Sequence, residues 1–124
     1  MDKYSRATIR EFMNPSNIGE LENPSGVGHI TDNTDAVELT FYLAINDSVI
    51  VDARYRVAGC TALIATLSVL TRELPGKTVE QAMAIDMAHL SQVLDSLPES
   101  KWRCAGYALQ AMHMAIDDFK SRTA

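Results

Sequence analysis

The sequence predicts an α+β fold in which helices pack on one face of a small three-stranded antiparallel sheet. Apolar residues alternate with polar ones between Val37 and Val57, which is typical of strands with one buried face. From Cys60 onward apolar residues instead recur at steps of three and four, which is typical of helices. No internal repeat, low-complexity segment or linker divides the chain, so we expect residues 1–124 to form one domain.

The first element is a predicted amphipathic helix from Tyr4 to Met13, with Ile9 and Phe12 on one side. Pro15 ends it, because the residue before a proline avoids the helical region. The stretch NPSNIGELENPSGVG that follows holds two prolines and three glycines, which predicts an ordered loop that wraps the domain and feeds an edge strand near 26–30.

A hairpin follows. Val37 to Ile45 and Val49 to Val57 alternate in polarity and are separated by the turn formers Asn46 to Ser48. The pattern predicts two antiparallel strands, each with one face in the core.

The rest of the chain predicts helices. The first spans Cys60 to Leu74, presents one apolar stripe to the sheet and ends at Pro75-Gly76. Thr78 and Asp86 can each cap a short connecting helix, and a last helix is predicted from about Trp102 to Lys120.

Composition narrows the function classes. Eleven Lys and Arg against 16 Asp and Glu give a net charge of −5, without a basic cluster to neutralise phosphates, so nucleic acid is not an expected partner. No apolar run approaches the roughly 20 residues of a membrane-spanning helix, and the N-terminus has no apolar signal core. We therefore expect a cytoplasmic protein without a membrane segment.

The two cysteines, Cys60 and Cys104, are the first candidates for chemistry. Each is predicted at the start of a helix, where unpaired N–H groups and the helix dipole stabilise a thiolate, and Arg103 would lower the pKa of Cys104 further. Thiolates bind soft metals and take part in sulfur transfer. The alternative is that both are small buried residues, since free cysteine is among the most buried residue types.

Asp35 is a third candidate, because a loop before the long strand could bring its carboxylate toward the two helix starts. The alternative is a turn-forming aspartate. His29, His89 and His113 show no ligand spacing and are interpreted as surface or hydrogen-bonded residues.

Several strings together resemble the IscU/NifU-type scaffold proteins of iron–sulfur cluster assembly. They are YS-x6-FMNPSNIGELENPSGVG from Tyr4, IVDARYRVAGCTALIA from Ile50, PGKTVEQAMAI from Pro75 and LPESKWRCAGYALQAM from Leu97. The resemblance covers nearly the whole chain in order, and it implies an IscU/NifU-like fold.

The resemblance also implies a site. The family holds a nascent iron–sulfur cluster or a zinc ion with three cysteines, an Asp and a His. Its second and third cysteines fall on Cys60 and Cys104, and its first falls on Asp35. The family's Asp falls on Val37 and its His on Arg103, so three of the five pocket positions have changed. We expect Asp35, Cys60 and Cys104 to be the ligands, with Arg103 and Val37 as accessory neighbours.

The partners implied by the resemblance are a cysteine desulfurase, a specialised chaperone pair and apo iron–sulfur acceptor proteins. Leu97, Pro98, Glu99, Ser100 and Lys101 correspond to the chaperone-recognition segment L-P-P-V-K, although Ser100 could instead cap the last helix. The implied function is a non-enzymatic scaffold that receives iron and sulfur and passes a cluster on, with Cys104 as the expected sulfur acceptor. The alternatives are a sulfur carrier or desulfurase activator, and a regulatory binding module without cluster assembly.

Overall fold

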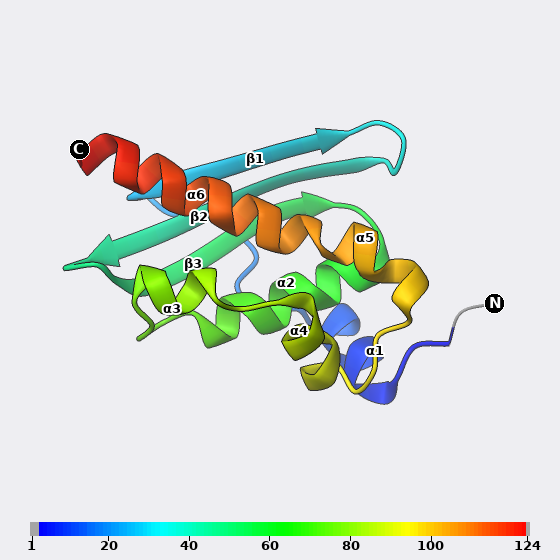
Figure 1. Cartoon of the computed structure of the whole chain (residues 1–124). Helices are drawn as coiled ribbons and strands as arrows, with labels where there is room; N and C mark the ends of the chain where they lie inside the picture. The colour runs from blue at the N-terminus through cyan, green and yellow to red at the C-terminus, as the bar shows by residue number, and fades with distance from the viewer. Residues whose placement is uncertain (1–2, 124) are drawn as a thin grey trace.

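The chain folds around one three-stranded antiparallel sheet in the order β1-β2-β3 (Figure 1). This computed structural model describes residues 3–123. The strands are β1 (Gly26–Asp32), β2 (Val37–Asn46) and β3 (Val49–Ala58), with Phe41 opposite Gly28 on one side and Tyr55 on the other. The predicted α+β class, edge strand and hairpin are confirmed. A register shift at Ala44/Ile45 was not predicted.

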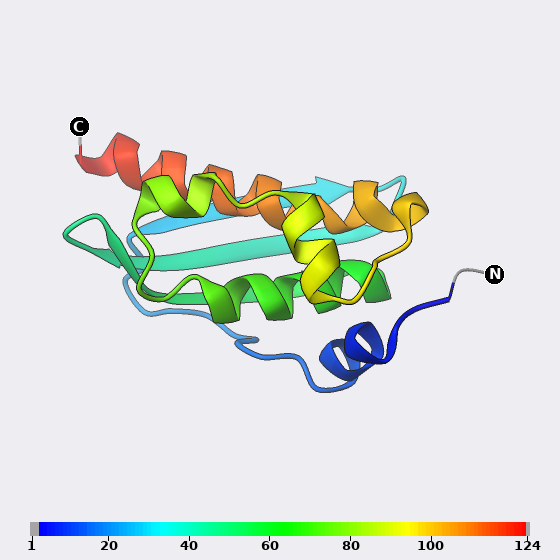
Figure 2. The same ribbon diagram turned by 60° about the horizontal axis from the view of Figure 1, so that its bottom comes forward.

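Helices cover one face of the sheet (Figures 1 and 2). They are α2 (Thr61–Glu73), α3 (Val79–Met83), α4 (Met87–Val93), α5 (Trp102–Ala105) and α6 (Tyr107–Thr123), with a 3-10 turn η1 (Glu99–Lys101) before α5. Helix α6 packs across β1 and β2, whereas α2 runs along β3. The sheet residues that face the helices are fully buried, including Leu39, Phe41, Leu43, Ala53 and Tyr55.

The close packing of α6 on β1 depends on two glycines. A Cβ atom on Gly26 or Gly28 would collide with the backbone carbonyl of Ala115 or Ala111 in α6. Strand and helix backbones can approach this closely only because neither glycine has a side chain.

Helix α1 (Arg6–Met13) begins later than predicted, because the Ser5 side chain caps it by accepting a hydrogen bond from the Thr8 N–H. The predicted apolar side is wrong for one residue: Ile9 is 48% exposed, whereas Thr8 is fully buried. Thr8 is satisfied because its hydroxyl donates to the Leu94 carbonyl. A polar contact with the segment after α4 therefore decides which side of α1 faces the protein.

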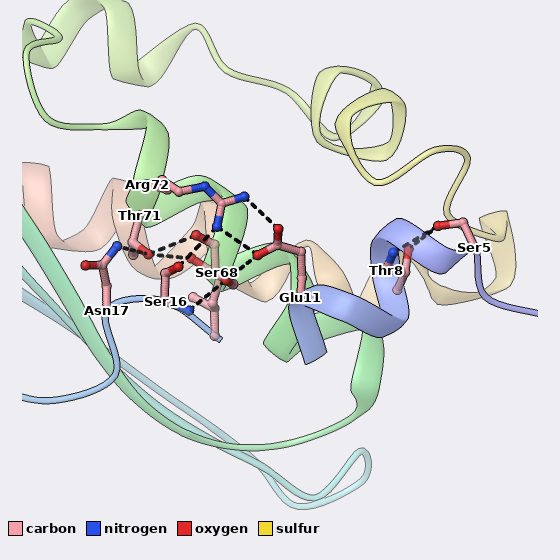
Figure 3. A network of polar contacts seen from close by, with 9 residues as sticks. Ser5, Thr8, Glu11, Ser16, Asn17, Ser68, Thr71 and Arg72 are labelled. Carbon is pink, nitrogen blue, oxygen red and sulfur yellow. Dashed lines mark hydrogen bonds and ion pairs between the residues drawn. The ribbon is translucent and has the colours of Figure 1, made fainter. Parts of the chain in front are cut away.

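The prediction that α2 buries a single stripe is incomplete. Its polar residues Thr66, Ser68 and Thr71 are buried as well as its apolar ones, because α1 and the loop after it cover the side away from the sheet. Ser68 donates to Glu11 and accepts from the Ser16 N–H (Figure 3). Helix α2 is thus the central helix of the molecule.

The N-terminal loop also contacts the outer edge of β3. The Tyr55 N–H donates to the Asn17 carbonyl, and the Gly19 N–H donates to the Tyr55 carbonyl. At the opposite edge of the sheet, the Val27 N–H of β1 donates to the Asp118 carboxylate of α6 at 2.9 Å. The ordered loop that the turn formers predicted is therefore held to the sheet by backbone hydrogen bonds.

The last helix is not continuous as predicted. It breaks at Gly106 into the four-residue α5 and the long α6. The capping residues predicted for the connecting helices are confirmed, with Thr78 and Gln81 forming a capping box at α3 and Asp86 capping α4. None of the helices within residues 3–123 is long and apolar enough to cross a membrane.

Candidate functional site

Asp35 lies in the turn between β1 and β2. Asp32, the last residue of β1, accepts hydrogen bonds from the N–H groups of Thr34 and Asp35 at 2.9 and 3.4 Å. Ala36 completes the turn with a left-handed φ of 54°. An aspartate that bonds the backbone two residues on is a common way to fix a turn. Asp32 thus performs the turn-forming role that was considered for Asp35, and the Asp35 carboxylate remains available for other contacts.

Cys60 is the N-cap residue of α2, directly after β3 and Gly59. Its carbonyl accepts the hydrogen bond from the Ile64 N–H, but its side chain makes no capping bond. A side chain on Gly59 would press on Leu63 of the buried face of α2. This tight strand-to-helix junction places the backbone of Cys60 at the start of α2.

Cys104 lies in α5, and its side chain contacts that of Cys60. The two cysteines are 44 positions apart in sequence, yet Cys60 Sγ donates to Cys104 Sγ at 2.9 Å. Both are free thiols and both are half-buried. The cysteines predicted to share a site are therefore in direct contact.

The chemical state of Cys104 differs from the prediction. Burial and the contact with Cys60 raise the pKa of the Cys104 thiol to about 12, from an ordinary value of 9.0. The expectation that the helix start and Arg103 stabilise a Cys104 thiolate is therefore wrong. Helix α5 has only four residues, and desolvation outweighs what so short a helix contributes.

Arg103 instead forms ion pairs with the turn. Its guanidinium lies 3.7 Å from an Asp35 oxygen and 3.9 Å from an Asp32 oxygen, with 71% of its side chain exposed. The Tyr107 hydroxyl donates a short hydrogen bond to the same Asp32 carboxylate. This bond, more than any other contact, lowers the pKa of Asp32 and raises that of Tyr107.

These side chains surround a pocket of about 220 Å³, which is lined by Asp35, Cys60, Ser100, Lys101, Arg103 and Cys104. All three predicted ligands line it. Within the described part of the chain, however, no three His, Cys, Asp or Glu side chains are arranged as a group that could hold a metal ion. The pocket combines two thiols, one carboxylate and cationic neighbours, but its carboxylate lies against Arg103.

Of the other predicted site residues, Ser100, Lys101 and Arg103 also line this pocket, whereas Val37, Leu97, Pro98 and Glu99 do not. Val37 is 2% exposed and packs in the core at the start of β2. Leu97 is also buried, and its carbonyl accepts a hydrogen bond from the Trp102 indole N–H. Glu99 and Ser100 are exposed in η1. The N-cap of α5 is Lys101, and it makes no side-chain capping bond, so Ser100 does not cap this helix as considered.

Sequence reasoning missed Asp32 and Tyr107. Both are ordinary residues for a strand end and a helix start, and they are 75 positions apart. The only signal for Tyr107 is the preceding Gly106, which marks the helix break that orients it.

Comparison with known proteins shows the family of the chain. The family model described as "NifU-like N terminal domain" matches residues 3–124. The iron–sulfur cluster assembly scaffold protein IscU 1 of Archaeoglobus fulgidus is 34% identical over 116 residues, which cover 94% of this chain and 76% of that protein. The protein named IscU in Escherichia coli K12 is 32% identical over 133 residues, covering 96% of this chain and 95% of that protein.

Solved structures agree in fold. The N-terminal NifU-like protein from Brucella abortus superposes with a TM-score of 0.78 at 19% identity, covering 94% of each chain. FiSufU from Fervidobacterium islandicum superposes with a TM-score of 0.77 at 19% identity, covering 91% of this chain and 96% of that one. The family model matches almost the full length of the chain, and the solved structures share its fold. The chain therefore belongs to the family of NifU-like N-terminal domains, together with proteins named IscU.

Proposed function

We propose that the protein is a divergent, non-enzymatic scaffold of iron–sulfur cluster assembly, for which iron or a nascent cluster is the cargo. Asp35, Cys60 and Cys104 would hold this cargo and release it to apo acceptor proteins. The observation that carries the proposal is that two cysteines 44 positions apart converge to 2.9 Å in a pocket that Asp35 also lines. The names of the similar full-length proteins support the same role.

The types of donor suit such a cargo, although Asp35 must move to join the two thiols. Iron and zinc both accept thiolate sulfur together with carboxylate oxygen, and a solvent molecule or a partner's side chain can complete a four-coordinate site. Because the Cys104 pKa is raised to about 12, its thiol is protonated at neutral pH and must lose a proton when metal binds. Metal affinity should therefore increase with pH.

Arg103 has two effects on this site. Its guanidinium cannot ligate a metal, but its charge stabilises an anionic cluster. It also lies 3.7 Å from the Asp35 carboxylate, so Asp35 must leave this ion pair to become a ligand. We infer that Asp35 is the exchangeable ligand, while the two thiols hold the cargo.

A cysteine desulfurase would supply the sulfur. A thiolate of this protein would attack the outer sulfur of the donor's persulfide, form a new S–S bond and release the donor's thiolate. Cys104 is the acceptor that the sequence predicts, and Cys60, whose sulfur lies 2.9 Å from that of Cys104, is the second candidate. Mass spectrometry after incubation with a desulfurase identifies which of the two thiols carries the added sulfur.

A chaperone pair would bind the segment from Leu97 to Lys101 in part. Leu97 is a core residue, so the segment can offer only its exposed positions, Glu99 and Ser100 above all, without local unfolding. Shifts of the Glu99 to Lys101 amide signals on addition of the chaperone would support docking, and unchanged signals would count against it.

A second candidate function is a sulfur carrier or desulfurase activator that builds no cluster. A related alternative is a regulatory binding module that does not take part in cluster assembly. The ion pair of Asp35 with Arg103 favours this candidate, because it leaves two thiols as the uncommitted donors. In this case bound zinc and stimulation of a desulfurase would replace cluster formation.

Anaerobic reconstitution distinguishes the candidates. The full chain is reduced, incubated with ferrous iron and sulfide, desalted and analysed for iron, sulfide and zinc. A brown species with stoichiometric iron and sulfide supports the scaffold, and it should be lost in Cys60→Ser and Cys104→Ser and weakened in Asp35→Ala. Asp117→Ala, on the exposed side of α6, is the matched control. Bound zinc together with stimulation of a desulfurase supports the second candidate. The absence of both iron and zinc would reject metal binding.

A further inference from the structure

The two thiols form an isolated pair. The sequence contains two cysteines in total, so each has the other as its sole partner for a bond within the chain. Cys60 Sγ and Cys104 Sγ lie 2.9 Å apart, and a disulfide bond of about 2.05 Å requires a further approach of less than 1 Å.

We propose that Cys60 and Cys104 form a redox-active dithiol, which exchanges with a low-molecular-weight disulfide and closes into a reversible intramolecular disulfide. This activity does not rest on the proposed scaffold function, because it requires no metal, cluster or protein partner. It gives the pocket a second chemistry, in which the protein's own sulfur atoms react.

The backbone holds the pair ready for this reaction. Cys60 is fixed at the junction of β3 and α2, and Cys104 is on α5, which packs directly on α2. Neighbours of both cysteines are core residues, with Leu63 and Ala105 fully buried. Because the two thiols are already in place, closing the disulfide orders little additional chain, which favours the intramolecular bond over a bond to a second molecule.

The pocket gives a small disulfide access to the sulfur atoms. Both cysteines line the cavity of about 220 Å³ and are only half-buried. Lys101 and Arg103 line the same cavity, and the Arg103 side chain is largely exposed. With Asp35, which lies against Arg103, the cavity carries charges of both signs, which suits a disulfide that bears both carboxylates and ammonium groups, such as glutathione disulfide.

The exchange balances in two steps. One cysteine loses its proton, and its thiolate attacks a sulfur of the small disulfide, which forms a mixed disulfide and releases one small thiolate. The second cysteine loses its proton and attacks the protein sulfur of the mixed disulfide, so that the intramolecular bond forms and a second small thiolate leaves. Both thiolates take up the released protons, and two electrons have passed from the protein to the small disulfide. The balance is the same whichever cysteine attacks first.

A closed disulfide would leave no thiolate to ligate a metal. The same pair would therefore exist in one of two exclusive states, oxidised and closed or reduced and able to bind cargo. Each state protects the sulfur atoms from the reaction of the other.

The test uses the full chain, reduced and freed of metal by a chelator, in buffers of glutathione and glutathione disulfide. Remaining thiols are alkylated after denaturation, and intact masses are measured. We expect the wild type to lose both alkylatable thiols together with two hydrogen atoms, to form no disulfide between molecules, to carry no glutathione and to recover with dithiothreitol. Cys60→Ser and Cys104→Ser should each stop at one attached glutathione.

Retention of both thiols in a buffer with a large excess of glutathione disulfide over glutathione would overturn the proposal. Stable attachment of glutathione to the wild type, or disulfide-linked dimers, would overturn it as well. The wild-type result decides the question even where a serine variant fails to fold. Zinc titration of the reduced protein is a separate readout: absence of binding counts against the scaffold function and leaves the dithiol intact.

Discussion

Tyr107, the first residue of α6, donates a hydrogen bond to Asp32, the last residue of β1. This contact ties the long C-terminal helix to the turn that carries Asp35. The same Asp32 carboxylate accepts from the turn backbone and lies 3.9 Å from Arg103. One carboxylate therefore connects the turn, α5 and α6 beside the two cysteines.

Replacing Tyr107 with Phe removes that connection. We expect the pKa of Asp32 to rise toward its ordinary 3.8, because the hydrogen bond from Tyr107 is the largest cause of its lowering. The stabilisation from Asp32 is present above pH 3.8 and is lost as pH falls through its lower folded pKa, so wild type and variant should converge in acid. Because the pKa of Tyr107 is raised above its ordinary value of 10, the stabilisation from this hydrogen bond should also be lost as pH rises above 10 and the tyrosine hydroxyl ionises.

Carboxyl carbon NMR titration measures the Asp32 shift, and urea unfolding at several pH values measures the stability difference. Tyr42→Phe is the matched control, since Tyr42 donates to Glu20 on the exposed face of the sheet. If the pKa of Asp32 were the same in the wild type and in Tyr107→Phe, the hydrogen bond from Tyr107 would not be the cause of its lowering.

The ion pair between Glu11 and Arg72 joins α1 to α2 (Figure 3). Arg72 donates to both Glu11 oxygens at 2.9 and 2.7 Å, and this bonding lowers the pKa of Glu11 against the opposing effect of burial. We expect Glu11→Gln to cost about 1 kcal/mol, the upper end for a partly exposed pair. The loss should be complete above pH 4.5 and should vanish as pH falls through the lowered pKa of Glu11.

Denaturant unfolding and amide exchange in α1 measure this effect. Glu20→Gln is the matched control, because the Glu20–Arg56 pair is more than half exposed and should contribute little. Equal losses in the two variants would show that the α1–α2 contact has no special weight.

Gly28→Ala should destabilise the packing of α6 on the sheet. The added methyl group would collide with the Ala111 carbonyl, and a backbone carbonyl cannot move aside without shifting the helix. We expect a loss of about 1–3 kcal/mol, as for other overpacked sites. Thermal unfolding provides the measurement, and Val27→Ala, on the opposite face of the same strand, should cost less. A Gly28→Ala variant as stable as the wild type would show that α6 can shift without loss of stability.

Oxidation should stabilise the fold if the dithiol closes. A disulfide bond between residues 44 positions apart lowers the conformational entropy of the unfolded chain. In the chain-entropy model this raises the free energy of unfolding by about 4 kcal/mol. Guanidinium unfolding of the oxidised and reduced protein should differ by up to this amount. The Cys60→Ser/Cys104→Ser double variant should show no response to oxidant, and a destabilised oxidised state would mean that closure strains the junction.

Removing Arg103 should release Asp35 for metal, if Asp35 is a ligand. We expect Arg103→Leu to bind Zn²⁺ up to about fivefold more tightly, which corresponds to about 1 kcal/mol for an exposed ion pair. Competition with a chromogenic chelator measures the affinity. Arg56→Leu, on the other face of the sheet, is the control. Weaker binding in Arg103→Leu would assign the guanidinium a supporting role.

The periodicity of the sequence is sufficient to predict the sheet and most helices, because alternation and helical spacing report which residues face the core. It was insufficient for α2, where Thr66, Ser68 and Thr71 are polar yet buried. Their hydroxyls bond to the preceding helical turn or to the N-terminal segment, and no local pattern announces such partners.

The sequence predicted that Asp35, Cys60 and Cys104 lie near one another, but it did not predict the contacts of the pocket or the roles of Asp32 and Tyr107 beside it. Cys60 could be located from the strand that ends before it, and Asp35 from its loop and from a family resemblance. The contact of Arg103 with Asp35 rather than with sulfur depends on the orientation of α5, which is set by the helix break at Gly106. A pair of side chains 68 positions apart has no signature in a single sequence.

The bonds at the two margins of the sheet have a further consequence. An exposed strand edge offers unpaired N–H and carbonyl groups to any other extended chain and so invites aggregation. Here Asn17 and Gly19 occupy the backbone groups of Tyr55 on β3, and Asp118 occupies the Val27 N–H on β1. The N-terminal loop and the C-terminal helix thereby each block one position of an edge strand against pairing with a strand of a neighbouring molecule.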